Sequence, residues 1–172
     1  NPRSRRIYVT AIVVINALIV YGIAFIPDCG FDAWSIADTM LVTFHQDGMG
    51  KFFACLIASI WMLVTFFAFE YITHEGDESR YLGFYTMTMG VLMGLCYSGN
   101  LIAFYMFFEL MTIITVPLVI HSRTKESIAA GMKYLGYSVF GAGLALFGLF
   151  FLNHFTGGQI GFTPGGNLNM SL

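Results

Sequence analysis

Hydrophobic residues gather in five long runs along the chain, with polar segments between them. The runs cover about residues 7–26, 51–72, 81–98, 100–120 and 129–152. A helix needs about 20 mostly apolar residues to span a bilayer, and each run approaches that length. None of the runs alternates as a transmembrane β-strand does, and lipid requires backbone polar groups to be paired within the segment. The pattern therefore predicts an all-α membrane protein, with a bundle of five transmembrane helices in residues 1–152.

The segments between the runs predict how the helices connect. The segment 27–50 is long and polar enough to lie on the membrane surface, and its DTMLVTFH portion is predicted as either a short strand or an interfacial piece. The SGN turn at 98–100 is so short that the helices on either side must be antiparallel neighbours. The loop 121–127 is basic, and Ser127 is the predicted N-cap of the last helix.

Basic residues predict the orientation, because cytoplasmic loops carry an excess of Lys and Arg. If the N-terminus is cytoplasmic, Lys51 is the basic residue on the outer side. The cytoplasmic side then holds Arg3, Arg5, Arg6, Arg80, Arg123 and Lys125. We therefore expect the N-terminus inside and the C-terminus outside. Residues 153–172 are predicted to form a Gly/Asn-rich tail on the non-cytoplasmic side.

Composition agrees with a membrane protein and limits the chemistry. The chain is 57% hydrophobic and 10% charged, whereas soluble domains carry about 25% charged residues. A net charge of −2 gives no footprint for nucleic acid. The three cysteines show no CxxC or Cys/His spacing, and no redox or hydrolytic centre is recognisable, so we expect no metal and no cofactor in this chain. A haem bundle would need two histidines at one depth, which the predicted spans do not offer.

Glu109 is the most informative residue, because it interrupts the run AFYMFFELMTIITVPLVI. Counted from Gly99 or His121, it lies roughly 15–18 Å deep, near the bilayer midplane. A carboxylate at that depth costs a few kcal/mol, so such residues usually have a function. A midplane acid suits a proton relay. The alternative is a neutral side chain hydrogen-bonded to a neighbouring helix.

Other residues in the last two runs could assist Glu109. Pro117 removes the helix hydrogen bond to the Ile113 carbonyl, and Thr112 and Thr115 lie near that gap, where water could be held. An ordinary packing kink is the simpler interpretation of Pro117. Lys133 is a candidate relay partner, although a lysine near the interface can also extend to water. Its depth differs from that of Glu109 by roughly 9 Å, too far for a direct ion pair without a kink or water.

Two further patterns have structural interpretations. Asp47, followed by Gly48, is predicted to cap the second helix. Glycines in the last run let helices approach closely in lipid, and they are therefore read as a packing signal. They are Gly136, Gly141, Gly143 and Gly148.

Three stretches together resemble a known family. They are FHQDGMGKFFACLIASIWMLVTFFAFEYI, GNLIAFYMFFELMTIITVPLVI and SIAAGMKYLGYSVFGAGLALFG. In order and spacing over residues 38–152 they resemble the antiporter-like subunits (M, L and N type) of respiratory complex I. Mrp sodium/proton antiporters and membrane-bound hydrogenases contain relatives of these subunits. The FFELMTIITVP stretch is most similar to the M type.

The resemblance implies a larger fold and roles for particular residues. Glu109 stands where the family has a glutamate of the proton path, which pairs with a lysine on a later helix. Phe108 stands where many members have Trp. Lys133 corresponds to a frequent basic residue, not to the main pairing lysine, which lies about two helices further on. Because the family's broken helices are missing, and the chain begins at Asn1, we expect an N-terminal partial chain.

The sequence therefore leads to one main hypothesis of function and two alternatives. The main hypothesis is a proton- or sodium-translocating subunit of a redox-driven pump, such as an NADH–quinone oxidoreductase-like or hydrogenase complex. The alternatives are an Mrp-type cation/proton antiporter subunit and a structural membrane subunit without transport. In each case we expect other membrane subunits and lipid as partners and a prokaryotic plasma membrane as location. Electron carriers would belong to other subunits.

Overall fold

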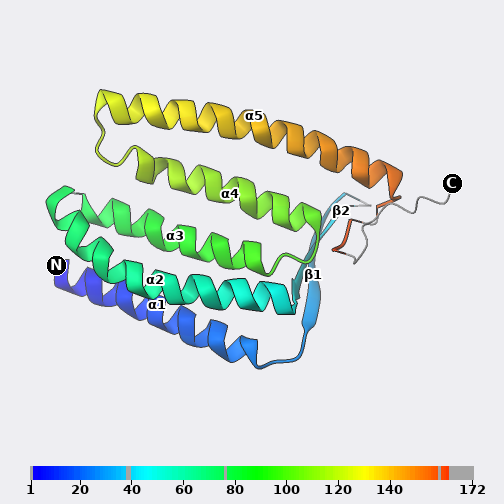
Figure 1. Cartoon of the computed structure of the whole chain (residues 1–172), viewed down its shortest axis with the longest axis horizontal. Helices are drawn as coiled ribbons and strands as arrows, with labels where there is room; N and C mark the ends of the chain where they lie inside the picture. Colours follow the sequence, from blue (N-terminus) through cyan, green and yellow to red (C-terminus); the bar gives the residue numbers. More distant parts are fainter. Residues whose placement is uncertain (1, 38–39, 76, 159, 163–172) are drawn as a thin grey trace.

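Five helices and one β-hairpin make up the computed structural model, which describes residues 2–37, 40–75, 77–158 and 160–162. In chain order the elements are α1 (Pro2–Ala24), β1 (Cys29–Ala37), β2 (Met40–Gln46), α2 (Gly48–Glu75), α3 (Glu78–Cys96), α4 (Leu101–Val119) and α5 (Lys125–Phe155). Successive helices run antiparallel and lie side by side in chain order, with the hairpin at one end (Figure 1). The prediction of an all-α membrane bundle is confirmed, and the hairpin is an addition at its end.

Most helices extend beyond the hydrophobic runs that predict them. α1 begins at Pro2 rather than near 7, α2 continues to Glu75, and α5 begins at Lys125 rather than near 129. Helical hydrogen bonds do not depend on lipid, so a helix continues into its polar flanks. The N-cap of α5 is Thr124, whose Oγ1 accepts from the Ser127 amide at 3.0 Å. The prediction of Ser127 as the cap was therefore wrong by three positions.

Four of the described helices are long and apolar enough to cross a membrane, and α3 is the exception. α3 is more polar, and it lies between α2 and α4 (Figure 1). Its buried positions include Tyr85 and Thr88, which pack within the bundle. The Tyr85 hydroxyl lies 3.0 Å from that of Thr65 on α2. A helix between two neighbours needs less apolar surface, and five spans stay a prediction.

The hairpin is held to the helical bundle by backbone hydrogen bonds. The Gly99 amide donates to the Thr43 carbonyl at 2.8 Å, and the His45 amide donates to the Tyr97 carbonyl at 2.9 Å. At the same end of the bundle, the Leu101 amide at the start of α4 donates to the carbonyl of Ile160, which follows α5, at 3.0 Å. The predicted piece 38–45 is thus a strand over its described part, 40–45. The strand that precedes it was not predicted.

Small residues at helix contacts form the centre of the bundle. One buried cluster joins α1, α2 and α3. Its members are Ala17, Val20, Ala54, Ala58 and Met93. At α4 and α5 the close approach is made at Gly131, where an added Cβ would lie 2.5 Å from Ile120. No described atom lies within 4 Å of a Cβ built at Gly136, Gly141, Gly143 or Gly148, so those glycines do not bring described helices together.

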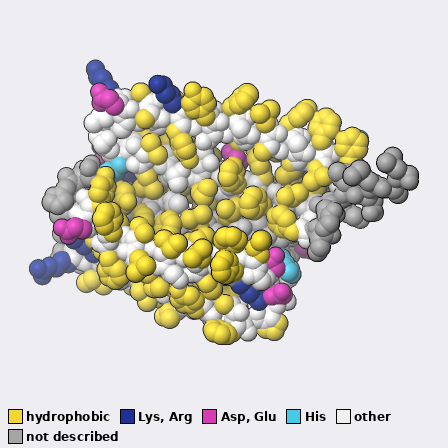
Figure 2. All heavy atoms as spheres, in the orientation of Figure 1, with side chains coloured by type: hydrophobic (Ala, Val, Ile, Leu, Met, Phe, Trp, Pro, Cys, Tyr) yellow, Lys and Arg dark blue, Asp and Glu magenta, His cyan; other side chains and the backbone are white. Residues whose placement is uncertain are grey.

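The surface of the bundle is hydrophobic between two charged ends. Hydrophobic side chains cover the face shown in Figure 2, and most charged side chains gather at the ends of the helices. Large apolar residues such as Phe66, Phe140 and Phe147 are exposed on the helices. Such a surface is stable when lipid or other membrane helices cover it. An acidic side chain is visible within the hydrophobic band, over the region of α4 and α5 (Figure 2).

Candidate functional site

Glu109 lies near the middle of α4, eight residues after Leu101 and ten before Val119. At about 1.5 Å per residue, the carboxyl is roughly 12–15 Å from either end of the helix. The side chain is half-buried, and Oε1 is buried without a hydrogen-bond partner among the described residues. An unpaired buried oxygen is costly for a protein, and this one belongs to the acid in the middle of an apolar helix, so Glu109 is a strong candidate for a functional group among the described residues.

The position of α4 is fixed at its first turn by Asn100. The side-chain oxygen of Asn100 accepts from the Ala103 amide at 2.9 Å, which satisfies one of the free amides of the helix start. Its side-chain nitrogen donates to the Leu41 carbonyl of β2. One buried residue therefore caps α4 and joins it to the hairpin, and this sets the depth of Glu109.

Tyr105 lies one turn before Glu109, on the same face of α4. Its hydroxyl donates to the Ala142 carbonyl of α5 at 3.2 Å. Residues spaced i, i+4 are neighbours on a helix surface, so Tyr105 is next to Glu109 on α4. The sequence offered a signal for this residue, because a tyrosine four positions before an intramembrane acid shares its face. It was not singled out there.

The predicted supporting residues lie in the second half of α4. Thr112 is buried, and its hydroxyl makes a long 3.4 Å bond to the Phe108 carbonyl. The Thr115 hydroxyl donates to the Thr112 carbonyl at 3.0 Å and lies 3.4 Å from the Tyr134 hydroxyl of α5. Pro117 lies in the last turn of the helix, which continues to Val119. Both hydroxyls thus line the side of α4 that leads from Glu109 toward the 121–127 loop.

Lys133 is not brought to Glu109. It is exposed on α5, and none of the ion pairs among the described residues joins it to Glu109. Gly131 and Ala142 mark the face of α5 that contacts α4. Lys133 follows Gly131 by about 200° of helical rotation and precedes Ala142 by about 180°. The lysine therefore points away from α4, toward whatever lies beyond the five helices.

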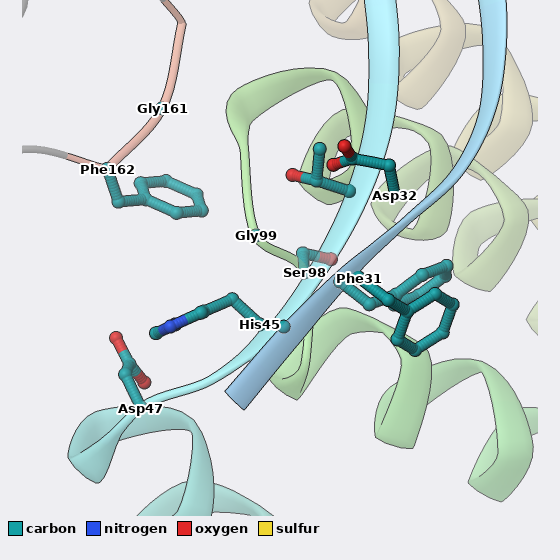
Figure 3. A pocket seen from close by; sticks show the side chains of 11 residues that line it. Phe31, Asp32, His45, Asp47, Ser98, Gly99, Gly161 and Phe162 are labelled. Atoms are coloured by element: carbon teal, nitrogen blue, oxygen red, sulfur yellow. The ribbon is translucent and has the colours of Figure 1, made fainter. Parts of the chain in front are cut away.

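A second polar region lies at the hairpin end of the bundle (Figure 3). It is a cavity of about 650 Å³, whose polar lining includes Asp32, Thr43, His45, Asp47 and Ser98. The His45 ring and the Asp47 carboxylate point toward one another, and Asp32, which pairs in register with Thr43, lies farther along the same face of the hairpin. Among the described residues, no group of three or more His, Cys, Asp or Glu side chains is placed to hold a metal ion.

Asp47 in this region also has a structural role. Its Oδ1 accepts from the Gly50 amide at 2.6 Å, so Asp47 caps the first turn of α2 and the prediction is confirmed. Nearby, Lys51 donates to Asp28 at 2.6 Å. This hydrogen bond holds the pKa of Asp28 below its usual value. The loop between α1 and β1 is thereby tied to α2.

The opposite end of the bundle carries a network of ion pairs. Glu78, at the start of α3, accepts from both Arg5 and Arg6 of α1. Burial disfavours the charged form of Glu78, but the two arginines outweigh it and hold the pKa of the carboxyl below its usual value. Arg80 donates to the His121 carbonyl at 2.6 Å, which ties α3 to the end of α4. The charges that predict a cytoplasmic side therefore lie together at one end.

Comparison with known proteins connects this arrangement with one family. The family model described as "NADH:quinone oxidoreductase/Mrp antiporter, TM" matches residues 98–169, which include Glu109 and Lys133. Subunit A1 of the Na⁺/H⁺ antiporter of Staphylococcus haemolyticus is 32% identical over 117 residues, or 67% of this chain. The Staphylococcus aureus subunit A1 is 32% identical over 105 residues, or 60% of this chain. The chain belongs to the antiporter-like membrane subunits.

This antiporter-like chain matches a small part of its relatives. It spans 14% of the Staphylococcus haemolyticus subunit and 13% of the Staphylococcus aureus one. A solved archaeal respiratory membrane complex, the membrane-bound sulfane sulfur reductase, contains a chain with the same fold. The TM-score is 0.75 at 21% identity, over 88% of this chain and 32% of that chain. The antiporter-like helices α4 and α5 thus lie in the part that the family model matches.

Proposed function

We propose that this antiporter-like chain takes part in moving protons, or sodium ions, across a membrane, and that Glu109 is its midplane relay. The observation that carries the proposal is the buried Oε1 of Glu109, which has no partner among the described residues in the middle of an apolar helix. An acid within the bilayer costs free energy, so residues of this kind usually have a function. A carboxyl that binds and releases a proton, or meets a passing cation, gives that position a use.

The surrounding groups support a relay rather than a fixed contact. The Tyr105 hydroxyl before Glu109 and the Thr115 hydroxyl after it both reach α5, and Thr112 adds a buried hydroxyl between Glu109 and Thr115. Hydroxyls both donate and accept, so they can order water beside a carboxyl. Pro117 leaves the Ile113 carbonyl without its helical donor, which adds an acceptor for water. We therefore propose that water reaches Glu109 along this side of α4.

Lys133 has a different role in this proposal from direct pairing. Because it points away from α4, it would influence Glu109 only through groups supplied from outside the five helices. A lysine near a helix end also reaches the aqueous interface. We propose that Lys133 lies at the junction between this bundle and a neighbouring membrane subunit or segment, where it passes protons between them.

The partners are proposed from the relatives. The named Na⁺/H⁺ antiporter subunits favour a cation/proton antiporter assembly, and the respiratory complex with the same fold favours a redox-driven one. In both cases the chain would act among other membrane subunits of a prokaryotic plasma membrane, with the N-terminus in the cytoplasm. Any electron carriers would lie in other subunits, and this chain would hold no cofactor.

The test is the variant Glu109→Gln, studied in the native assembly in membrane vesicles. Glutamine keeps the size and polarity of the side chain but cannot release a proton. We expect ion-dependent pH changes across the vesicle membrane to fall about a hundredfold or more, as for loss of an essential acid–base group. The amount of assembled complex, measured on native gels, should stay unchanged.

The matched control is Glu70→Gln, because Glu70 is an exposed carboxylate near the end of α2. That variant should transport normally. Normal transport by Glu109→Gln would refute the relay. It would instead favour a structural subunit, for which Glu109→Gln changes stability alone.

A further inference from the structure

Tyr105 of α4 forms a hydrogen bond to α5 whose acceptor already has a partner within its own helix. Its hydroxyl donates to the Ala142 carbonyl of α5 at 3.2 Å. Ala142 lies inside the continuous helix α5, where a carbonyl already accepts from the amide four residues further on. The tyrosine is therefore a second, weaker donor to an acceptor that is already satisfied. It can leave that carbonyl at little cost.

The nearest acceptor in need of a donor is on the same helix. Oε1 of Glu109 is buried and unpaired among the described residues, and Tyr105 and Glu109 are spaced i, i+4 on one face. Because side chains at this spacing are neighbours, a change of side-chain rotamer is a short route by which the hydroxyl could change its partner.

The surroundings of Tyr105 limit its other partners. Tyr105 lines a groove of about 330 Å³ between α4 and α5. Every other lining residue of that groove is apolar. They are Leu101, Phe104, Phe108, Ala145, Gly148, Leu149 and Leu152. In such an environment a hydroxyl bond to a charged oxygen is stronger than it is in water.

Other titratable groups near α4 have different neighbours. On α5, the Tyr134 hydroxyl lies against Thr115, and Lys133 is on the far face of the helix. On α3, the Tyr85 hydroxyl lies against Thr65 of α2. Tyr105 is therefore the group on the described elements that is best placed to respond to the charge of Glu109.

We propose that Tyr105 is a positioning residue for Glu109. Its hydroxyl donates to the Ala142 carbonyl while the carboxyl is protonated, and it turns to donate to Oε1 when the carboxyl has released its proton. The tyrosine keeps its own proton in both states. The exchange links the charge of Glu109 to the contact between α4 and α5. This inference rests on the proposed function, because it concerns the same carboxyl.

The test is infrared difference spectroscopy between low and high pH, on the complex purified in mild detergent. In the wild type, a carboxyl band and a tyrosine C–OH band should change together, because the hydroxyl changes its acceptor when the carboxyl ionises. The carboxyl band is assigned by its loss in Glu109→Gln. The tyrosine band should be lost both in Tyr105→Phe and in Glu109→Gln.

The matched control is Tyr134→Phe, which removes another hydroxyl between α4 and α5 and should keep both bands. Ion transport by Tyr105→Phe should be about tenfold slower, as expected for one lost hydrogen bond to a charged group. A tyrosine band that persists in Glu109→Gln would overturn the role of Tyr105, and so would normal transport by Tyr105→Phe when transport by Glu109→Gln is impaired. The spectra do not depend on transport, so the two proposals fail in different ways. Failure of the relay is seen as normal transport by Glu109→Gln. Failure of the coupling between Tyr105 and Glu109 is seen as a tyrosine band that does not depend on Glu109.

Discussion

Asn100 joins α4 to strand β2 through a single side chain. It is only 6% exposed, caps α4 through the Ala103 amide, and donates to the Leu41 carbonyl of β2. A buried polar side chain with both ends bonded fixes the groups around it. Asn100 therefore determines where α4 begins, and Glu109 keeps its depth because the cap does not slip.

Asn100→Ala tests that role. Alanine removes the cap, which costs about 1 kcal/mol, and removes the partly buried hydrogen bond to the Leu41 carbonyl, which costs about 1–2 kcal/mol more. We expect the apparent free energy of unfolding to fall by roughly 2–3 kcal/mol, measured by titration with a denaturing detergent. Thr124→Ala is the control, because Thr124 caps α5 in an exposed position and should cost about 1 kcal/mol or less. Equal losses in the two variants would contradict the bridging role.

At the scale of elements, the approach of α2 to the end of α3 depends on Gly50. This residue is buried in the first turns of α2, where a Cβ would lie 2.3 Å from the Cys96 carbonyl oxygen. The obstacle is main chain, so a side-chain rotation does not relieve it. Only a glycine allows the two backbones to approach this closely.

Gly50→Ala should therefore separate α2 from α3 and lower stability by about 1–3 kcal/mol, in spite of the better helix propensity of alanine. Gly48→Ala is the matched control in the same turn, because no described atom lies within 4 Å of a Cβ built there. It should be neutral or slightly stabilising. Thermal unfolding of both variants in one detergent measures the difference, and equal melting temperatures would show that the contact at Cys96 is not restrictive.

The elements differ in how well the sequence predicts them, for physical reasons. Lipid requires long apolar helices, so the apolar runs that form most of α1, α2, α4 and α5 are readily visible in the sequence. β1 was missed because its pairing with β2 is irregular between Asp32 and Trp34, and between Ser35 and Ala37. Such irregularities break the alternation by which a strand is recognised. The hairpin is also held by hydrogen bonds between β2 and the α3–α4 turn, which are distant in the sequence, so no local pattern indicates them.

In the candidate site, too, features set within one helix could be predicted from the sequence, whereas those set by contacts between helices could not. The position of Glu109 near the middle of its helix followed from counting residues, because α4 is continuous across its apolar run. The orientation of Lys133 did not follow, because counting gives depth and not rotation. Rotation of α5 is set by the packing of Gly131 on Ile120. The bond from Tyr105 to Ala142 depends on that same rotation, so no local pattern predicts it.

At the scale of the whole molecule, charge divides the bundle into two different ends. Arg5, Arg6 and Glu78 join α1 to α3 at the end that holds the N-terminus, where Arg80 and Arg123 also lie. The hairpin end holds Asp28, Asp32 and Asp47, with Lys51 as a basic partner of Asp28. Basic loops stay in the cytoplasm, so this asymmetry predicts that the hairpin lies outside.

Cys29 provides a direct test of that orientation. It is an exposed free cysteine in β1, whereas Cys55 and Cys96 are half-buried in helices. A membrane-impermeant maleimide added to intact cells should label the wild-type chain, and Cys29→Ser should abolish the labelling. A cysteine introduced by Ser122→Cys in the Cys29→Ser background lies in the exposed α4–α5 loop, at the opposite end. It should be labelled only after the cells are opened. The reverse labelling pattern would place the arginine-rich end outside the cell and would contradict the predicted orientation.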